Sequence, residues 1–261
     1  MKIEAILTPA ELPALAKRDL RGVVCVVFDV LRATSTFVTA LHNGAKAIVP
    51  VFEIAEALTF RQKQPDVLLG GERDGVRIRA AQTGGIDFDL GNSPREYTPE
   101  KVRGKTIVST TTNGTRALRA CTGAKTVLAA SFLNLTATVN FIKKLRPANV
   151  LVVCAGTREN TALEDVLAAG ALCEILDATF APALSPLGRG KGVIQMSDSA
   201  EISRRIYAQA KSDLLATVCT SENARRLLAI PELRDDVPFC LRSDVCPLVA
   251  QMDADGTIHL I

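Results

Sequence analysis

Acidic and basic side chains occur directly after apolar runs, or inside glycine-rich turns, at several points of the chain. The carboxylates in such positions are Asp29, Glu72, Asp89 and Asp165, and the guanidinium groups are Arg32, Arg73, Arg116 and Arg158. Carboxylate oxygens are ligands that Mg²⁺ prefers, and bound Mg²⁺ keeps waters and bridges phosphate oxygens. Arginine pairs with phosphate, sulfonate and carboxylate groups through parallel hydrogen bonds. The combination therefore predicts a site for a small ligand with several negative charges.

The first of these positions lies in the stretch FDVLRATST, residues 28–36, which follows the apolar run VVCVV. Asp29 either forms the turn before the next helix or faces a ligand. The hydroxyls at 34–36 can cap that helix, so capping does not require Asp29 or Arg32. Because open α/β sheets bind ligands outside the carboxyl ends of their strands, we predict that Asp29 and Arg32 are catalytic.

A second polar stretch, VSTTTNGTRAL, ends a predicted strand and begins a helix near Thr115. Backbone N–H groups at such a helix start attract anions, and Gly114 permits close approach of the backbone. A well-capped helix is the simpler interpretation, but the polar run is longer than one cap requires. The residues that we predict to bind substrate, here and in the other turns, are Arg73, Thr111, Thr112, Asn113, Gly114, Thr115, Arg116 and Arg158.

Two other segments combine a capping pattern with an acid that the pattern does not use. In FDLGNSPRE, Ser93 and Glu96 fit a capping box around a proline at the first helical position. Farther along the chain, Thr161 and Glu164 fit a second box. Asp165 lies outside that box, so we predict that Asp165 is the functional acid of its segment.

Several known phosphate-handling signatures are excluded. The Asp-x-Asp-x-Thr motif of haloacid-dehalogenase phosphatases fails because Leu31 occupies the place of the second acid. The chain's GKT sequence, residues 104–106, lacks the earlier glycine of the Walker motif, because Pro99 occupies that place, so it is not a Walker-type nucleotide site. Cys154 and Arg158 are separated by three residues, whereas cysteine phosphatases need five.

Composition narrows the class of protein further. The formal net charge of +3 is small and evenly spread, which argues against nucleic acid as a partner. No apolar run approaches the roughly 18 residues of a membrane span, and the N-terminus does not resemble a signal peptide. The seven cysteines form no CxxC pair, which indicates reduced thiols in the cytoplasm. A homodimer is the default expectation for assembly.

The elements that must position these residues follow one repeated pattern of strand, polar turn and helix. Strands are predicted over 23–28, 105–110, 126–131 and 149–156, and the helices that follow them over 34–44, 115–123, 134–145 and 161–176. Continuous β-branched runs indicate strands buried on both faces. We therefore predict an α/β fold, layered α/β/α, with a largely parallel or mixed sheet. The chain is either one domain over 1–261 or two α/β lobes at about 1–180 and 181–261.

The remaining predictions concern the C-terminal part and a similarity between two segments of the chain. A loop is predicted over 181–199, a helical segment over 199–218 and a short helix over 221–230. A terminal strand pair is predicted to turn at Asp255-Gly256. The segments that begin at Thr39 and at Arg116 resemble each other, which indicates either a duplication or two similar units that each end their helix with glycine.

Taken in order, the stretches DVLRATST, GGERDG, FDLGNSPRE, TTTNGTRAL and CAG…TALEDVLAAG resemble the magnesium-dependent 2-phosphosulfolactate phosphatases of the coenzyme M pathway. The resemblance spans about residues 23 to 175 and is weaker in the tail from Ser221 to Val249. It implies a cytosolic Mg²⁺ enzyme that hydrolyses 2-phosphosulfolactate to 3-sulfolactate and phosphate. The insert-like RIRAAQTGG departs from the family pattern, which usually runs almost directly into a Gly-Phe-Asp segment. Asp87 and Asp89 are therefore alternatives for the aspartate of that segment.

On this basis we expect a metal-assisted phosphomonoester hydrolase. Mg²⁺ is expected on Asp29, Asp165 and Glu72, with Glu164 as the alternative to Asp165. Water attacks the phosphoryl group directly, or Asp29 is transiently phosphorylated; the sequence allows both. The competing hypotheses are a non-catalytic or regulatory binder of small anionic metabolites, and a lyase or transferase that acts on a phosphorylated hydroxyacid.

Overall fold

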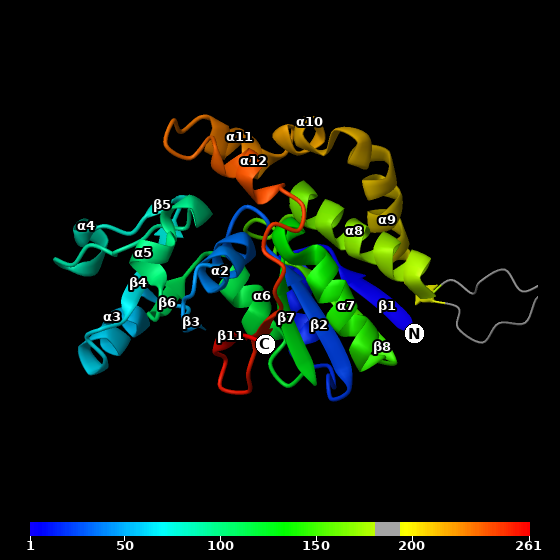
Figure 1. Cartoon of the computed structure of the whole chain (residues 1–261), viewed down its shortest axis with the longest axis horizontal. Helices are drawn as coiled ribbons and strands as arrows, with labels where there is room; N and C mark the ends of the chain where they lie inside the picture. The colour runs from blue at the N-terminus through cyan, green and yellow to red at the C-terminus, as the bar shows by residue number, and fades with distance from the viewer. Residues whose placement is uncertain (181–193) are drawn as a thin grey trace, which may run out of the picture.

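The computed structural model describes residues 1–180 and 194–261, and a sheet of eleven strands forms its centre (Figure 1). The strands are β1 (Lys2–Ile6), β2 (Val23–Phe28), β3 (Ala47–Pro50), β4 (Leu68–Arg73), β5 (Val76–Arg77), β6 (Thr106–Thr110), β7 (Thr126–Ala130), β8 (Asn149–Cys154), β9 (Gln195–Met196), β10 (Ala250–Met252) and β11 (Ile258–Leu260). Their order across the sheet is β5-β4-β6-β3-β11-β10-β7-β2-β8-β1-β9.

The sheet is mixed, as predicted, and the four predicted strands form β2, β6, β7 and β8. β2 lies between β7 and β8 and runs parallel to both, because strand-helix-strand crossovers connect this part of the chain. The antiparallel pairs are β4–β5 and those of the hairpin β10–β11, which pairs with β7 on one side and with β3 on the other.

Helices cover both faces of the sheet, which confirms the layered α/β/α prediction. They are α1 (Leu12–Leu15), α2 (Ala33–His42), α3 (Ile54–Lys63), α4 (Ala80–Thr83), α5 (Pro99–Val102), α6 (Gly114–Ala120), α7 (Leu135–Leu145), α8 (Leu163–Phe180), α9 (Asp198–Ala210), α10 (Leu214–Cys219), α11 (Glu222–Leu228) and α12 (Asp236–Cys240). On β2, Cys25 and Val27 pack with α2 and α6, while Val24 and Val26 pack with α7 and α8. Both faces of β2 are therefore buried, as its unbroken apolar run predicts.

The C-terminal part adds helices at one end of the sheet and a hairpin at its centre. The predicted helical segment is present as α9 and α10, with a 3₁₀ turn at Lys211–Asp213 between them. The terminal strand pair is also confirmed: Gly256 takes φ +87 in the turn, and β10–β11 lies between β7 and β3 (Figure 1). The predicted loop over 181–199 is wrong where it can be examined, since β9 and the start of α9 occupy its end; its residues 181–193 lie outside the described part.

Both predicted capping boxes are wrong, because stronger partners lie nearby. Ser93 begins a 3₁₀ turn but donates its hydroxyl to the buried carboxylate of Asp236 at 2.7 Å. Glu96 accepts the backbone N–H of Gly91 and not that of the capping residue. In the second box, Glu164 accepts a hydrogen bond from the amide of Asn223, and its other oxygen is buried without a partner.

The sheet is curved so that strands distant in its order reach one place. Five strands lie between β2 and β4 in that order, and a flat sheet would hold them roughly 29 Å apart. Nevertheless, Asp29 at the end of β2 and Glu72 near the end of β4 line the same cavity. Helices α2 and α6 cross the same face in opposite directions, since α2 leads from β2 to β3 and α6 from β6 to β7. Their first turns meet beside Asp29.

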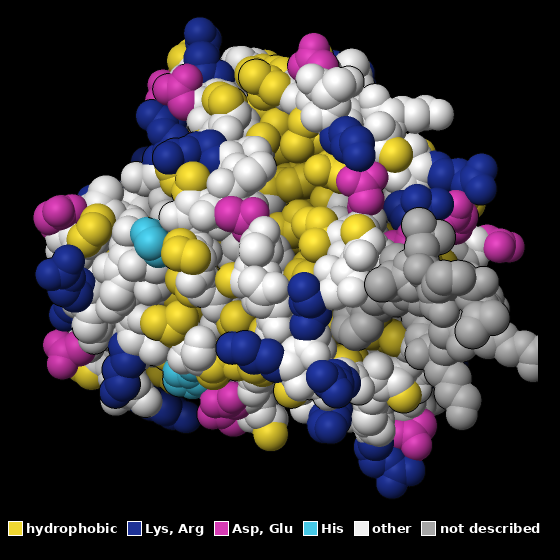
Figure 2. Space-filling model, turned by 45° about the vertical axis from the view of Figure 1, so that its right-hand side comes forward, with side chains coloured by type: hydrophobic (Ala, Val, Ile, Leu, Met, Phe, Trp, Pro, Cys, Tyr) yellow, Lys and Arg dark blue, Asp and Glu magenta, His cyan; other side chains and the backbone are white. Residues whose placement is uncertain are grey.

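The surface shows interspersed charges. On the face in Figure 2, Lys and Arg side chains alternate with acidic and uncharged ones, in keeping with the small net charge of the sequence. Within residues 1–180 and 194–261, no helix has both the length and the apolar character required to cross a membrane.

Candidate active site

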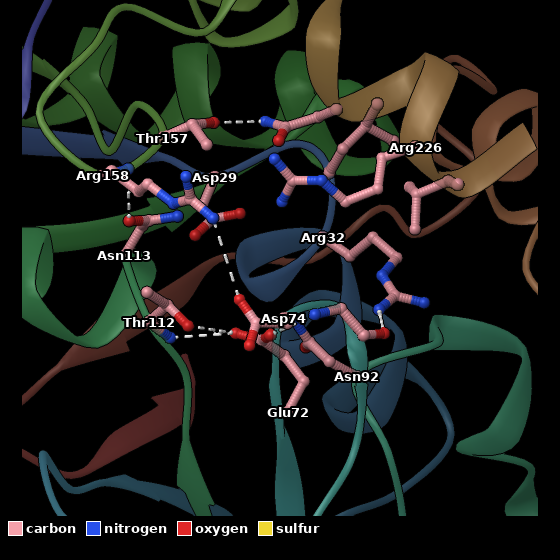
Figure 3. Close-up of a pocket in the computed structure, with 14 residues that line it drawn as sticks. Asp29, Arg32, Glu72, Asp74, Asn92, Thr112, Asn113, Thr157, Arg158 and Arg226 are labelled. Atoms are coloured by element: carbon pink, nitrogen blue, oxygen red, sulfur yellow. Dashed lines mark hydrogen bonds and ion pairs between the residues drawn. The ribbon is translucent and has the colours of Figure 1, made fainter. Parts of the chain in front are cut away.

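A cavity of about 60 Å³ lies where the carboxyl ends of β2, β4 and β8 meet the turn before α6 (Figure 3). The residues that line it are Asp29, Leu31, Arg32, Glu72, Asp74, Gly75, Asn92, Thr112, Asn113, Thr157, Arg158, Asn223, Arg226 and Leu227. Each of the five sequence segments singled out above contributes to this wall. Residues that are far apart in the chain thus converge on one small and strongly polar space.

Asp29 is held at the floor of the cavity by the start of α2. Its Oδ1 accepts the backbone N–H of Ala33 at 3.0 Å, so Asp29 itself satisfies the first turn of the helix. The prediction that the hydroxyls at 34–36 cap the helix is therefore wrong: Thr34 bonds to the backbone of Asp29, and the other two bond to carbonyl oxygens. Burial, with the nearby charges of Glu72 and Glu164, raises the pKa of Asp29 to about 7.

Glu72 joins the glycine turn after β4 to the turn before α6. Its Oε1 accepts both the N–H and the hydroxyl of Thr112 at 2.9 Å, and its Oε2 accepts the N–H of Gly75 at 2.7 Å. The side chain is 8% exposed. A buried carboxylate that accepts three hydrogen bonds is held rigidly, so Glu72 fixes the distance between the GGERDG and TTTNGTRAL segments.

The turn before α6 lies directly against Asp29. A Cβ on Gly114 would be 2.7 Å from Asp29 Oδ2 and 2.6 Å from the Cβ of Ala33, so only glycine fits there. Two of the turn's backbone donors are already used, since the N–H of Thr112 binds Glu72 and that of Thr115 approaches Thr111 Oγ1 at 3.3 Å. The backbone donors left for a ligand are those of the two residues between, Asn113 and Gly114.

Arg32 is buried beside the cavity and bonded at both ends of its guanidinium group. Nη1 donates to Asp236 Oδ2 at 2.7 Å and Nη2 donates to the carbonyl of Gly75 at 2.6 Å. The two side chains of the ion pair are 2% and 0% exposed. Asp236, on α12, therefore fixes the orientation of Arg32, which was predicted from the sequence to be catalytic.

Asp165 lies behind the cavity wall and is not among the lining residues. Its Oδ1 accepts the N–H of Val30 at 2.8 Å and its Oδ2 accepts the N–H of Gly156 at 3.0 Å, so it fastens the loops after β2 and β8 together. Burial and the charges of Asp29 and Glu164 raise the pKa of Asp165 well above its ordinary value.

The other predicted arginines divide between two places. Arg158 lines the cavity, donates its backbone N–H to Asn113 Oδ1 at 3.1 Å and has Nη2 at 3.9 Å from Asp74. Arg73 and Arg116 line a neighbouring hollow on the other side of the threonine turn. Arg73 donates to backbone carbonyls and to a threonine hydroxyl, and Arg116 pairs with a glutamate at 2.7 Å.

The two alternative acids of the insert-like segment both serve the local fold. Asp89 Oδ2 accepts the N–H of Leu69 at 2.7 Å and also binds Arg61. Asp87 Oδ1 accepts the N–H of Ala80 at 2.7 Å. Neither acid lines the cavity.

Several lining residues were not singled out from the sequence. They are Asn92, Thr157, Asn223 and Arg226, together with Asp236 behind Arg32. Asn92 and Thr157 lie inside predicted motifs, so their polarity was a usable signal. The other three are in short C-terminal helices whose sequences carry ordinary helical patterns, and no local feature distinguishes them.

The oxygen donors of the cavity suit a hard divalent cation. Asp29 and Glu72 supply carboxylates, and Asn92 Oδ1 is buried without a hydrogen-bond partner. In the part of the chain that the structure describes, no three His, Cys, Asp or Glu side chains are grouped so that they could hold a metal by themselves. The predicted trio of Asp29, Glu72 and Asp165 is thus not gathered as a cage. Mg²⁺, however, usually needs only one or two carboxylates, with waters and substrate phosphate as its other ligands.

Fold and site together define an α/β protein with a small polar cavity at the carboxyl edge of its sheet, where carboxylates and arginines form a lining suited to a small anion. The family model described as 2-phosphosulpholactate phosphatase matches residues 6–255. A relative from Caldanaerobacter subterraneus subsp. tengcongensis is 37% identical over 237 residues, which cover 90% of each chain. A relative from Thermotoga petrophila is 39% identical over 84% of this chain and 85% of its own, and one from Clostridium botulinum is 33% identical over the full length of both. All three bear the name "Probable 2-phosphosulfolactate phosphatase".

The chain belongs to the 2-phosphosulfolactate phosphatase family, since the match covers nearly its whole length. The resemblance noted in the sequence is thereby confirmed, and it extends into the C-terminal part that supplies Asn223, Arg226 and Asp236.

Proposed function

We propose that this protein is a phosphoric monoester hydrolase that converts 2-phosphosulfolactate to 3-sulfolactate and phosphate. The observation that carries the proposal is the convergence of all five motif segments on one cavity of a chain that belongs to this family. The substrate is small and carries three anionic groups. The cavity is correspondingly small, and three arginines line it: Arg32, Arg158 and Arg226.

The phosphoryl group is assigned to the inner end of the cavity, beside Asp29. Gly114 lies directly against Asp29, so the backbone N–H groups of Asn113 and Gly114 are assigned to phosphate oxygens at this end. Arg32, held by the buried Asp236 and by the carbonyl of Gly75, offers its remaining N–H groups without reorganisation, so it can stabilise charge that develops in the transition state.

We propose Mg²⁺ as the cofactor. Asp29, Glu72 and the unpartnered Asn92 Oδ1 would hold it, while Asp165 would support them from behind. Bound Mg²⁺ polarises a phosphoryl oxygen and neutralises charge. Burial raises the pKa of Asp29, and the charges of Glu72 and Glu164 raise it further; a divalent cation at the same place would offset both effects, which supports the proposed cofactor.

The proposed function is tested by measuring phosphate release from a panel of phosphorylated sulfo- and carboxy-hydroxyacids, each with Mg²⁺ and with EDTA. We expect release from 2-phosphosulfolactate that depends on Mg²⁺. Affinity without release would indicate a non-catalytic binder of anionic metabolites. Release accompanied by an organic product other than the free alcohol would indicate a lyase or transferase.

The compartment and assembly remain predictions. The seven cysteines are free thiols, and six are buried, which supports a reducing compartment such as the cytoplasm. Size-exclusion chromatography with light scattering checks the expected homodimer.

A further inference from the structure

We infer that Arg226, on α11, binds the sulfonate group of the substrate and makes the site selective for sulfonated phosphoesters. The inference rests on the proposed function and deepens it, because it names the residue that recognises the sulfonate. This group distinguishes the substrate from simpler phosphohydroxyacids.

The geometry of α11 presents one face to the cavity. Asn223, Arg226 and Leu227 line it, and their spacing of three and four residues places them on one side of a helix. Ser221 caps this helix, with its Oγ accepting the N–H of Ala224 at 3.2 Å, so the start of the helix is fixed. Figure 3 shows the guanidinium group of Arg226 extending toward Asp29 and Arg158.

Asn223 fastens this face of α11 to the body of the site. Its Nδ2 donates to Thr157 Oγ1 at 2.6 Å and to Glu164 Oε1 at 2.7 Å. Glu164 is 1% exposed and lies on α8. An amide held by two acceptors on other elements cannot rotate freely, so Arg226, less than one turn later, is held over the cavity.

The ion-pair partner of Arg226 is easily exchanged, as is that of Arg158, whose Nη2 lies 3.9 Å from the exposed Asp74. Among the residues that the structure describes, Arg226 pairs with Glu222 of the same helix at 3.1 Å, and Glu222 is 63% exposed. Such surface pairs contribute little, so a ligand anion can replace the glutamate at small cost. Arg32, by contrast, is bound at one end of its guanidinium group by the buried carboxylate of Asp236 and at the other by the carbonyl of Gly75.

The shape of the substrate assigns the sulfonate to this arginine. The phosphoryl group occupies the inner end of the cavity, beside Asp29 and Glu72. In 2-phosphosulfolactate the sulfur is one bond farther from phosphorus than the carboxylate carbon is. The sulfonate therefore extends farthest toward the outer wall, where the side chain of Arg226 is 35% exposed. A planar guanidinium group binds two sulfonate oxygens at once.

The test compares two substrates in three variants. The first substrate is 2-phosphosulfolactate; the second is 2-phospholactate, which carries a hydrogen where the first carries the sulfonate. For Arg226→Gln we expect kcat/KM on 2-phosphosulfolactate to fall about 10- to 100-fold, and kcat/KM on 2-phospholactate to change by less than about threefold. Arg226→Lys keeps the positive charge but not the paired N–H donors of the guanidinium group, so it should lose less of kcat/KM on 2-phosphosulfolactate than Arg226→Gln does. Arg225→Gln is the matched control, because Arg225 is exposed on the same helix and does not line the cavity.

Equal losses on both substrates in Arg226→Gln would overturn the inference, and so would no loss on either, provided that the variants unfold at the wild-type temperature. If the loss is equal and the unfolding temperature has fallen, the residue is structural and the inference is also wrong. Absence of phosphate release from both substrates by the wild type would defeat the proposed function itself. Selective loss in Arg226→Gln, with Arg225→Gln unchanged, supports the assignment.

Discussion

Replacement of Asp236 by alanine should destabilise the protein severely, although this residue was not singled out from the sequence. Asp236 accepts hydrogen bonds from Arg32 and Ser93, each at 2.7 Å, and its side chain is fully buried. Asp236→Ala would leave the guanidinium group of Arg32 buried with only the carbonyl of Gly75 as a partner. It would also remove the acceptor of the Ser93 hydroxyl.

The size of the effect follows from the burial of both partners. Removing one member of a buried ion pair costs about 3–5 kcal/mol, since the other charge remains desolvated and unpaired. The neighbouring Asp235 supplies the control, because it is 65% exposed and lies 3.3 Å from Arg95. Asp235→Ala should cost less than about 1 kcal/mol.

Urea unfolding of the two variants measures this difference directly. We expect the free energy of unfolding of Asp236→Ala to fall by about 3–5 kcal/mol at an unchanged denaturant slope. Phosphate release should fall as well, because Arg32 loses the partner that orients it. A loss of stability in Asp236→Ala no larger than in Asp235→Ala would refute the reasoning.

Three further predictions concern the inner end of the cavity. Gly114→Ala should lower kcat/KM by about 100-fold, since its methyl group would displace Asp29; unchanged kinetics would show that the contact is not tight. Asp165→Ala should lower the free energy of unfolding by about 2–6 kcal/mol, because two buried N–H groups lose their acceptor, and urea unfolding checks this. Phosphate release should stop in EDTA and return with added Mg²⁺; activity that survives thorough chelation would count against the proposed cofactor.

Much of the fold was predictable because its signals are local. The unbroken apolar runs of β2 and β8 indicate strands buried on both faces, and the polar turns after them indicate the edge where the site lies. The glycine-aspartate pair at 255–256 indicated the terminal turn. That this hairpin lies at the centre of the sheet was not predictable, because its pairing with β7 and β3 depends on residues more than a hundred positions away.

The candidate site was predictable only in part, for a similar reason. Asp29, Arg32 and Glu72 stand in polar turns after strands, and the structure brings them to one cavity. Arg73 and Arg116 adjoin equally polar turns, yet they line the neighbouring hollow and not this cavity. The capping pattern at Ser93 was misleading because Asp236, a charged acceptor far along the chain, competes for the same hydroxyl.

The most direct test of the central claim is phosphate release from 2-phosphosulfolactate, with Mg²⁺, by the wild type and by Asp29→Asn. Asparagine retains an oxygen that can accept the N–H of Ala33, so the variant should fold as the wild type does. We predict release by the wild type and a rate at least about 100-fold lower in the folded variant. A wild type that releases no phosphate, or a variant that releases it at the wild-type rate, would contradict the claim that Asp29 lies at the centre of a phosphatase site.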